Sequence, residues 1–534
     1  MQIKVKHLEG YAYGAIQPSA VLSFSNLTSN IDQITTQLAN LKVGLPAFEG
    51  AQRFSGETSL IEQNEGPALF VTLIDILNRH CGDQRFTPIK AFEEDGVICF
   101  AVPTLSPQMI TANTRAVHLL LQKLAKGMSH EQLSKTLDGL KKRMRPFLPG
   151  GTNAGNFIAA AAERKIPFKI FSNRYIFFGY GSGSRIFNSS LTDQESVTGV
   201  QLAKSKVDTN RLLKMSGIPV AEQARVRTID DALRFAEKVG YPVVLKPEAE
   251  EQGRGVFANI VDENELKECF EHLSQSRYRS ILIEQHVPGD VYRINTIDDE
   301  VVRVVKRIPA KVVGDGRSTI EELLTAFNNQ PIRNDPNSSM VKLKLDDDVV
   351  RTISKLSLQA KSIPKKEDVV YLTSTSSVSR GGHAIDFYED FHLENRMLCE
   401  KISRIMRLNI TGIDVLAVDA SQTWRNGNFV VCEVNSQPQL GVSHMHIYHD
   451  FISRKIKGKP HIKLSISSVY ASETTLFDPI SDTMEIVISP ESVLRHGCQV
   501  QYFDDLEISD DVSDEDRQKI ERMLVSVTPE LDEK

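Results

Sequence analysis

The sequence predicts a mixed α/β (α+β) fold, and two of its features support that prediction. From residue 203 onward, short β-branched runs alternate with segments whose apolar residues recur at helical spacing. At 146–151 the stretch PFLPGG combines prolines with glycines, which interrupt regular structure and favour a domain boundary. We therefore expect an α/β N-terminal domain at 1–150, a larger domain at 151–460 and a small C-terminal extension at 461–534.

Composition narrows the class of protein. Of the 534 residues, 41% are hydrophobic and 25% are charged, which is typical of a soluble globular chain with sizeable cores. A net charge of −6 argues against nucleic acid as a main partner. The six cysteines form no C-x-x-C pair, which argues against a zinc site or a disulfide framework. The N-terminus lacks the apolar core of a secretory signal, and no apolar run approaches the ~20 residues of a membrane span. We therefore expect a cytoplasmic protein without a membrane or nucleic-acid partner.

Strand-like runs and two helices follow one another in the N-terminal domain. The predicted strands are Ile3–Val5, Ala20–Phe24, Ala68–Leu73 and Val97–Val102. The first helix begins at Ser106-Pro107 and ends at Gly127, and the second begins at a capping box formed by Ser129 and Gln132. Its basic last turn, KKRMR at 141–145, suits a helix C-terminus, so we favour a solvated helix end over a binding patch there.

The segment that follows combines one helix with two strands. We expect the helix at Asn156–Lys165 and the strands at Phe168–Phe171 and Tyr175–Phe178. The glycine-rich FGYGSGSRIF departs from the dinucleotide pattern G-x-G-x-x-G, because Ser184 stands where the last glycine belongs. A tight turn is therefore the favoured interpretation.

From residue 203 to 460 the expected elements alternate. The predicted helices are Lys206–Met215, Thr228–Lys238, Glu263–Leu273, Ser318–Phe327 and His392–Leu408, with capping boxes at Thr228/Asp231 and Ser318/Glu321. The predicted strands are Val243–Leu245, Ser280–Val287, Tyr292–Ile297, Val301–Ile308, Ile413–Val418 and Phe429–Val434, and residues 329–340 are loop-like. Beyond 460, alternation at His461–Ser467 and Met484–Ser489 precedes an acidic run at 504–518, which predicts a small β appendage with a mobile acidic tail.

The stretch YPVVLKPEAEEQGRGV at 241–256 has the features of a polyphosphate-binding element. Lys246 ends an apolar strand, and Gly253-Arg254-Gly255 follows a polar loop. Glycines allow backbone N–H groups to approach phosphate oxygens, and a lysine adds a point charge. An exposed strand end followed by a flexible turn fits the same pattern equally well.

A second polar group lies at the end of the last predicted strand pair. Glu433 and Asn435 are two positions apart, so both project from one face of a strand. Asp414 on the preceding strand can meet them, whereas Asp419, nearer the turn, is a weaker candidate. Oxygen ligands of this kind suit Mg²⁺. A pair of surface polar residues is the alternative, and it is less favoured because a carboxylate ending an apolar run is costly to bury unpaired.

Seven segments share a wider pattern with a known superfamily. They are SKVDTNRLL (205–213), VVLKPEAEEQGRGV (243–256), ILIEQHVPGDVYR (281–293), RIPAKVVGDGRSTIEEL (307–323), RGGHAIDFYEDFHLEN (380–395), TGIDVLAVD (411–419) and EVNSQP (433–438). Together they resemble the ATP-grasp superfamily, most closely the amide-forming half of cyanophycin synthetases and less closely bifunctional glutathione synthetases. GDGRSTIEEL and GGHAID are the most specific segments, because generic ATP-grasp proteins lack them. HLEGYAYGAI also resembles the start of the cyanophycin synthetase N-terminal domain, whereas the Mur-ligase-like half of those proteins is not matched beyond about 460.

The resemblance implies sites for ATP and for Mg²⁺, with Mn²⁺ as an alternative ion. The matching residues are, for the phosphates, Lys206 and Lys246; for the loop that closes over them, Gly253, Arg254 and Gly255; and for the strand beside adenine, Glu284, His286 and Val287. The implied metal ligands are Asp414, Glu433 and Asn435.

It also implies a reaction. Arg293 and Arg307 match arginines that face the transferred phosphoryl and acyl groups, and the loop Arg380, Gly381, Gly382 and His383 matches a substrate-binding loop. The implied activity is that of an ATP-dependent carboxylate–amine ligase. Such an enzyme forms an amide or peptide bond on an amino acid or short peptide through an acyl phosphate, and family members often form homo-oligomers. A kinase of ATP-grasp type and a non-catalytic nucleotide-binding partner subunit are the alternatives.

The chain departs from the family pattern at several positions. Val291 stands where an acid is expected near the ribose, Lys306 where an acid is common, and His383 where threonine is usual. The glutamates within 248–251 place negative charge beside the phosphate loop. These departures bear on substrate identity more than on nucleotide binding.

Overall fold

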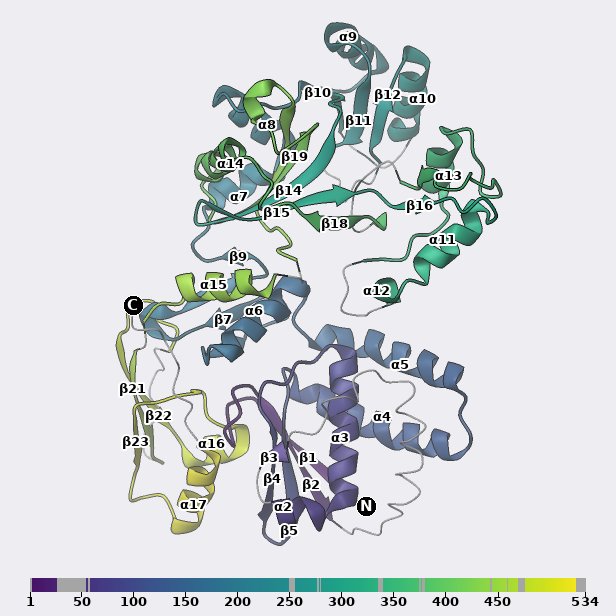
Figure 1. The fold of residues 1–534 in the computed structure, drawn as a ribbon. Coiled ribbons are helices and arrows are strands. Elements are labelled where there is room, and N and C mark those ends of the chain that lie inside the picture. Colours follow the sequence, from purple (N-terminus) through teal and green to yellow (C-terminus); the bar gives the residue numbers. More distant parts are fainter. Residues whose placement is uncertain are drawn as a thin grey trace. The chain divides into compact units, whose positions relative to one another are not determined.

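The computed structural model describes residues 2–25, 54–55, 58–248, 255–275, 278, 280–334, 340–373, 376, 380–441, 444–458, 460–468 and 476–524. The chain divides into two compact units, residues 1–193 together with 445–534, and residues 194–444 (Figure 1). We call them unit 1 and unit 2. The three-part domain division expected from the sequence differs from this grouping at 151–193 and at 445–460, and it stays a prediction. The difference arises because α15 (Met445–Lys455) packs against α6 (Thr152–Glu163), where the Tyr448 hydroxyl donates to Asn153 Oδ1 at 2.9 Å.

The first part of unit 1 is a five-stranded sheet covered by helices. Its strand order is β1 (Gln2–Leu8), β2 (Ser19–Ser25), β5 (Val97–Pro103), β4 (Ile89–Glu94) and β3 (Phe54–Ser55). The helices are α2 (Thr58–Glu62), α3 (Glu65–Cys81), α4 (Pro107–Ala125) and α5 (His130–Met144), followed by the short η2 (Arg145–Phe147). The capping box of Ser129 and Gln132 is present. Phe24, Phe70 and Phe100 meet at the centre of the core between sheet and helices.

The predicted strand at Ala68–Leu73 is wrong. These residues lie inside α3, most of whose side chains are buried, including Phe70 and Ile74. An apolar run with no polar face can be a buried helix or a buried strand, so periodicity cannot distinguish the two.

The rest of unit 1 contains two further sheets. One has the order β6 (Phe168–Ile170), β7 (Ile176–Phe178), β8 (Arg185–Asn188) and β9 (Leu191–Thr192), with η3 at Gly181–Gly183. The other is parallel and has the order β22 (Thr483–Ile488), β21 (His461–Ile466) and β23 (Asp505–Ile508), with helices α16 (Pro490–His496) and α17 (Asp514–Met523).

The glycines of FGYGSGSRIF are explained by close packing within unit 1. A Cβ on Gly181 would lie 2.2 Å from the Ser481 carbonyl oxygen, and one on Gly183 would lie 2.4 Å from that of Lys457. The segment forms a tight turn, as the sequence predicts.

The mobile acidic tail predicted at 504–518 is wrong for these residues. Part of the run is the edge strand β23, and part is the first turn of α17, which Ser513 caps. The acids at the start of α17 suit the positive end of the helix dipole, and Ile520 and Met523 on the same helix are buried. Acidic composition alone therefore did not reveal the amphipathic helix.

Unit 2 contains two main sheets. The smaller has the order β10 (Gln223–Val226), β13 (Ile281–Gln285), β11 (Val243–Pro247) and β12 (Phe257–Ile260), with helices α9 (Ile229–Val239) and α10 (Glu263–Ser274) packed on it. The larger has the order β18 (His383–Asp386), β15 (Glu300–Ile308), β14 (Asp290–Ile297), β19 (Ile410–Ala417) and β20 (Phe429–Asn435). Further helices are α7 (Val197–Lys204), α8 (Lys206–Met215), α14 (Leu393–Met406) and the short η5 (Trp424–Asn426). Residues 309–373 add β16 (Lys311–Val313), β17 (Val369–Tyr371), α11 (Ile320–Asn328), α12 (Pro331–Asn334) and α13 (Asp347–Ser354).

Two local predictions in unit 2 need correction, and one is confirmed. The capping box of Thr228 and Asp231 is present. The box at α11 is formed by Thr319 and Glu322, one residue later than predicted, because Ser318 donates its hydroxyl to Asp315 instead. Part of the predicted loop 329–340 is helical, namely α12, and residues 335–339 lie outside the described residues.

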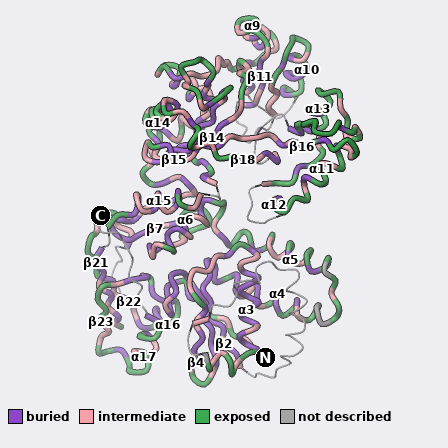
Figure 2. Tube along the Cα trace, in the orientation of Figure 1, coloured by how far each residue is buried: buried purple, intermediate pink, exposed green. Residues whose placement is uncertain are grey.

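The larger sheet of unit 2 has one apolar face and one polar face. Tyr292, Ile294, Ile413 and Val415 are buried in the same core as α14. Figure 2 colours the chain by burial and shows buried residues along β14. Because strand side chains alternate, the intervening residues of β14 and β19 face the other side. That second face carries the predicted site residues. Within the described residues, no helix is long and apolar enough to cross a membrane.

Candidate nucleotide and ligase site

Charged side chains form a row across the polar face of the larger sheet. Arg293 of β14 lies opposite Asp414 of β19, and Asp414 lies opposite Glu433 of β20. Arg307 of the neighbouring strand β15 brings its Nη1 to 3.5 Å from Asp414 Oδ1. The structure thus brings together, on one sheet, both predicted catalytic arginines and two of the predicted metal ligands.

Arg293 and Asp414 form a two-pronged ion pair at the centre of this row. Arg293 Nε donates to Asp414 Oδ1 at 2.5 Å, and Nη2 donates to Oδ2 at 2.7 Å. Burial alone would raise the pKa of Asp414, but the guanidinium groups of Arg293 and Arg307 outweigh it and hold the pKa below its ordinary value. Asp414 is therefore an anion at neutral pH.

A β-bulge in β20 shapes the end of the row, and the sequence reasoning missed it. Asp414 pairs with Glu433 and Val415 pairs with Val431, so Cys432 is the extra residue. Cys432 and Glu433 are both accessible, while Val431 and Val434 are buried, which shows that the alternation changes parity at the bulge. The signal was available, because apolar residues at 429, 431 and 434 cannot all share one face of a regular strand.

The two predicted phosphate lysines lie close to this row. Lys206 is the first residue of α8, and its Nζ is 3.5 Å from Glu433 Oε1. Lys246 of β11 reaches Glu284 of the adjoining strand β13, with Nζ 2.5 Å from Oε1. Burial would lower the pKa of Lys246, but Glu284 outweighs it, with smaller contributions from Cys432 and Glu433, so the pKa lies above its ordinary value.

The segment predicted to flank adenine follows the end of β13. Its backbone is anchored on both sides, because Gln285 N–H donates to the Glu222 carbonyl at 2.9 Å and His286 N–H donates to that of Pro242 at 3.1 Å. Burial lowers the pKa of His286, so its ring is neutral at pH 7. The Glu284 carboxylate pairs with Lys246, and Val287 lies two residues beyond β13.

The acidic stretch after Lys246 is partly accounted for. Glu248 receives two hydrogen bonds from the guanidinium of Arg225 on β10, that from Nε being 2.9 Å long, and this pairing lowers the pKa of Glu248. Its charge is therefore balanced. A Cβ on Gly255, whose φ is +67°, would lie 3.0 Å from the Pro247 ring. Glu250, Glu251, Gly253 and Arg254 lie outside the described residues.

The predicted substrate loop is held by residues distant in sequence. Arg380 forms ion pairs with Asp346 at 2.8 Å and with Asp348 at 2.9 Å. Gly381, whose φ is +80°, gives its carbonyl oxygen to Arg333 Nη2 at 2.9 Å. Gly382 is buried next to Gly381. Burial lowers the pKa of His383, and the positive charges of Lys311 and Arg333 lower it further. The sequence reasoning did not foresee Asp346, Asp348 or Arg333, because nothing local links them to the loop.

The motif GDGRSTIEEL has a structural explanation. Asp315 accepts hydrogen bonds from the backbone of Arg317 and Ser318, which, together with the Ser318 hydroxyl, lower its pKa to about 2. A Cβ on Gly314 would lie 2.2 Å from the Lys365 carbonyl oxygen. Among the departures from the family pattern, Lys306 pairs with Asp290 at 2.5 Å, so this cation has a nearby anion.

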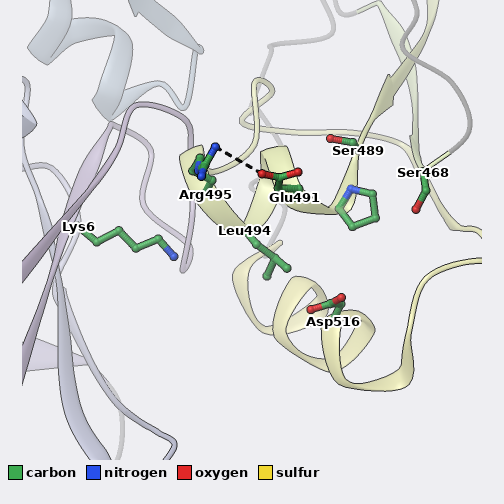
Figure 3. Close-up of a pocket in the computed structure, with 8 residues that line it drawn as sticks. Lys6, Ser468, Ser489, Glu491, Leu494, Arg495 and Asp516 are labelled. Atoms are coloured by element: carbon green, nitrogen blue, oxygen red, sulfur yellow. Dashed lines mark ion pairs between the residues drawn. The ribbon is translucent and has the colours of Figure 1, made fainter.

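A cavity of about 710 Å³ lies in unit 1 and is distinct from this site. It is lined by Lys6, Ser468, Ser489, Pro490, Glu491, Leu494, Arg495 and Asp516 (Figure 3). Glu491 and Arg495 pair with each other at 3.4 Å, and both are largely exposed. Its charges are mixed, and none of the predicted site residues lines it.

The donor set at the end of β19 and β20 fits a hard cation. Asn435 Nδ2 donates to the Gly412 carbonyl at 3.3 Å, which leaves the amide oxygen for a cation. Together with Asp414 and Glu433 it offers oxygen ligands only, as Mg²⁺ prefers. Among the described residues, no three His, Cys, Asp or Glu side chains gather as a metal-holding group. The amide of Asn435 and further oxygens from bound phosphates would therefore complete such a site.

Comparison with known proteins defines the class of fold. Residues 199–291 match the model of the ATP-grasp domain family. It is similar to cyanophycin synthetase of Trichormus variabilis, with 34% identity over 310 residues that cover 58% of this chain and 34% of that protein. It is also similar to the glutathione biosynthesis bifunctional protein GshAB of Clostridium perfringens, with 28% identity over 54% of this chain and 38% of that protein. The chain thus spans about a third of the length of the curated relatives that it matches.

A comparison with solved structures gave the following alignment. The bifunctional glutathione synthetase from Pasteurella multocida aligns over 75% of this chain and 55% of its own, with 18% identity and a TM-score of 0.44.

Proposed function

We propose that this chain is an ATP-dependent carboxylate–amine ligase that forms an amide or peptide bond on an amino acid or a short peptide. The observation that carries the proposal is the charged row of the larger sheet, in which Arg307, Arg293, Asp414 and Glu433 lie beside Lys206, while Lys246 pairs with Glu284 on the smaller sheet. Such a row can hold a polyphosphate and neutralise the charge that develops as a phosphoryl group moves.

Each group of residues has a proposed task in binding ATP. Lys206 and Lys246 hold phosphates, and Gly253, Arg254 and Gly255 close over them. Glu284, His286 and Val287 flank adenine. The pairs Lys246–Glu284 and Lys206–Glu433 hold both ammonium groups in place, with a separation of 2.5 Å in the first and 3.5 Å in the second. An ion pair that already orders a lysine reduces the entropy lost when phosphate binds.

The metal site proposed at Asp414, Glu433 and Asn435 would hold Mg²⁺ or Mn²⁺. Bound there, the ion would offset the negative charge of the ATP phosphates. Asp414 is shared with Arg293 through both of its oxygens, so this carboxylate links the cation site to the arginine that faces the reacting group. The other charges at this row are those of the protein's own side chains.

The proposed reaction has two steps. An oxygen of the substrate carboxylate attacks the γ-phosphorus of ATP. The bond between the γ-phosphorus and the oxygen that bridges it to the β-phosphate breaks, so ADP departs and an acyl phosphate is formed. The nitrogen of a neutral amine then attacks the acyl carbon, inorganic phosphate departs with the C–O bond electrons, and the nitrogen loses a proton to give the amide. Arg293 and Arg307 are placed to stabilise the negative charge of both transition states, and the loop 380–383 orients the substrate.

The test is an ADP-release assay over a panel of carboxylates paired with amines, supplied as amino acids and short peptides. Release that requires both partners, with an amide detected by mass spectrometry, supports the proposal, and Lys246→Ala and Glu433→Ala should strongly reduce it. ADP release with a phosphorylated product and no amide would instead indicate a kinase. Tight ATP binding without ADP release for any pair would indicate a nucleotide-binding partner subunit. The substrates' identities, the homo-oligomer and the cytoplasmic location stay predictions.

A further inference from the structure

Residues 309–373 form a substructure of unit 2 between β15 and β18, which we call the bridging module. Its own core contains Val312, Ile320, Leu324, Val349 and Ile353. The motif GDGRSTIEEL stabilises the module itself. This role does not account for a contribution of the module to the site.

One side of the module holds the substrate loop. The side chain of Arg333 is buried, its guanidinium lies 3.6 Å above the Phe327 ring, and it donates to the carbonyl oxygens of Val341 at 2.7 Å and Gly381 at 2.9 Å. A Cβ on Gly381 would lie 3.3 Å from Leu343 of the module. The backbone of the substrate loop is therefore fixed to the module by a hydrogen bond and by close packing.

The N-terminal end of α13 holds the first side chain of the same loop. Arg380 donates to both oxygens of Asp346, the cap of α13, at 2.8 and 3.1 Å, and to Asp348 at 2.9 Å. Charge-assisted pairs of this two-pronged kind are stronger and more directional than single contacts. They raise the pKa of Arg380 and fix the direction of its guanidinium.

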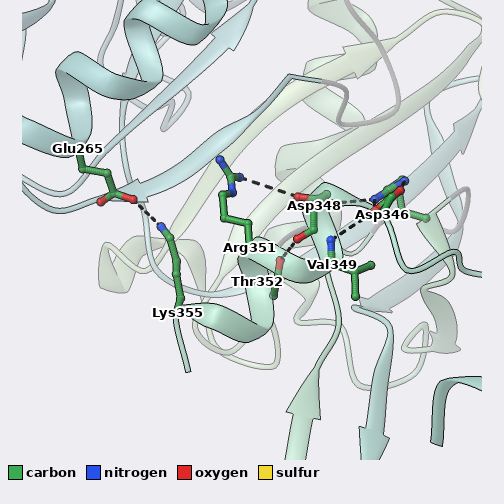
Figure 4. Close-up of polar contacts among 8 residues, drawn as sticks. Glu265, Asp346, Asp348, Val349, Arg351, Thr352 and Lys355 are labelled. Carbon is green, nitrogen blue, oxygen red and sulfur yellow. Dashed lines mark hydrogen bonds and ion pairs between the residues drawn. The ribbon is translucent and has the colours of Figure 1, made fainter. Parts of the chain in front are cut away.

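The other end of α13 contacts the smaller sheet. Arg351 lies 4.5 Å above the ring of Phe257 on β12, and Lys355, which caps α13, has its Nζ 2.6 Å from Glu265 of α10 (Figure 4). β12 is the strand that begins just after Gly255, at the end of the proposed phosphate loop. One helix of eight residues thus connects the strand next to the phosphate loop with Arg380.

We propose that the bridging module couples nucleotide binding to the position of the substrate loop, with Asp346, Asp348 and Arg333 as positioning residues. The inference rests on the proposed function for the identity of both sites. A nucleotide that orders β12 and α10 also restrains Lys355 and Arg351, and therefore α13. Asp346 and Asp348, at the other end of α13, then restrain Arg380. Both ends are needed, because a helix anchored at one end only cannot transmit a restraint to the other.

The coupling is expected to be modest. The Lys355–Glu265 pair is partly exposed, with side chains 46% and 25% accessible, so solvent screens it. Roughly fivefold coupling is at the low end of the range for allosteric linkage. This magnitude is large enough to measure by hydrogen exchange of individual segments.

The test is hydrogen–deuterium exchange of the full chain with and without Mg²⁺ and AMP-PNP, a non-hydrolysable ATP analogue. We expect AMP-PNP to slow exchange about fivefold in α13 and in 380–386 as well as beside the phosphate loop. Lys355→Glu places two carboxylates together, and it should remove the distant protection while leaving AMP-PNP affinity within about twofold. The double variant Glu265→Lys/Lys355→Glu restores opposite charges and should restore the protection. Lys361→Glu, an exposed lysine later in the same module, is the matched control.

The outcomes separate this inference from the proposed function. Absence of AMP-PNP binding would overturn the proposed nucleotide site and, with it, the coupling. Binding with no protection of 380–386 would overturn the coupling alone. Equal protection of 380–386 in the wild type and in Lys355→Glu would also overturn the coupling. Loss of protection in Lys355→Glu with recovery in the double variant supports it, and recovery cannot be explained by a damaged fold.

Discussion

Two buried arginine–aspartate pairs in this chain are buried to a similar degree and have very different surroundings. In unit 2, Arg293 Nε donates to Asp414 at 2.5 Å on the polar face of the larger sheet. In unit 1, Arg85 Nε donates at 2.9 Å to Asp75, which lies within α3. The side chains of all four residues are at most 11% accessible. Arg293 binds Asp414 through two hydrogen bonds and Arg85 binds Asp75 through one, but burial of the pair itself does not distinguish a site from a structural ion pair.

The neighbouring charges do distinguish them. Around Asp75 the cations Arg79 and Arg85 share one buried carboxylate, and neighbouring Asp83 is satisfied by Thr104 and Leu105. The row in unit 2 together with Lys206 and the Lys246–Glu284 pair has four cations against three carboxylates. The cations are Lys206, Lys246, Arg293 and Arg307, and the carboxylates are Glu284, Asp414 and Glu433. A surplus of positive charge beside partly accessible lysines is what a polyanion requires. The unit 1 cluster is closed, because its carboxylates are buried and hydrogen-bonded within unit 1, so we expect it to act on stability alone.

Lys246→Ala should give the largest effect. It removes one of the surplus cations and leaves Glu284 without its partner, so we expect ADP release to fall roughly 10²–10³-fold, as for other preorganised charged groups. The measurement is the steady-state rate with the best substrate pair, together with AMP-PNP affinity. Lys238→Ala, at an exposed position late in α9, is the control and should change neither quantity. A Lys246→Ala enzyme within threefold of the wild type would contradict the role of the row.

Arg85→Ala should have the next largest effect, and on a different property. Truncation leaves Asp75 buried with only Arg79 nearby, and unpaired buried carboxylates cost about 3 kcal/mol of folding free energy. Burial already raises the pKa of Asp75 despite both arginines. Chemical denaturation followed by a probe in unit 1 measures the loss. The rate of ADP release by the folded fraction should match the wild type, and a large loss of activity there would show that this cluster also serves the reaction.

The sequence supported local structure and strand faces better than it supported contacts between distant segments. The capping boxes at Ser129 and Thr228 follow from short-range patterns, and both are present. The common face of Asp414, Glu433 and Asn435 follows from strand periodicity, although the bulge at Cys432 does not follow from a regular alternation.

Other features depend on tertiary packing that a single sequence does not display. The helix at Ala68–Leu73 is apolar on nearly all sides because sheet and helices enclose it. Arg380 is 34 residues from Asp346, and nothing in either local pattern indicates their pairing. The acidic run became a strand and a helix because Ile520 and Met523 contribute to the cores of unit 1.

Gly412→Ala tests the fine geometry of the row. An added Cβ would lie 2.7 Å from Arg293 Nη1 and 2.6 Å from the Pro438 Cβ, so the guanidinium must move away from Asp414. A displacement of this kind in a preorganised site should reduce ADP release roughly tenfold without removing any charged group. The rate is compared with that of Gly139→Ala in α5, where an added Cβ meets no atom within 4 Å. Unchanged activity in Gly412→Ala would mean that the Arg293–Asp414 geometry is not required.

The smallest effect is a pH dependence in the closed cluster of unit 1. Burial raises the pKa of Asp83 to about 7, although hydrogen bonds from Thr104 and Leu105 lower it in part. Because the folded pKa lies above the unfolded value, the contribution of Asp83 to stability is complete below about pH 4 and is lost as pH rises to about 7. Between pH 6 and pH 8 this loss should amount to about 1 kcal/mol. The measurement is the free energy of unfolding of the wild type minus that of Asp83→Asn at each pH, which cancels other titrating groups. Asn keeps the size of the side chain and carries no charge, so this difference should fall across the window. A difference independent of pH would show that Asp83 stays ionised, and that even this closed cluster holds its carboxylates as anions, as the row in unit 2 holds Asp414.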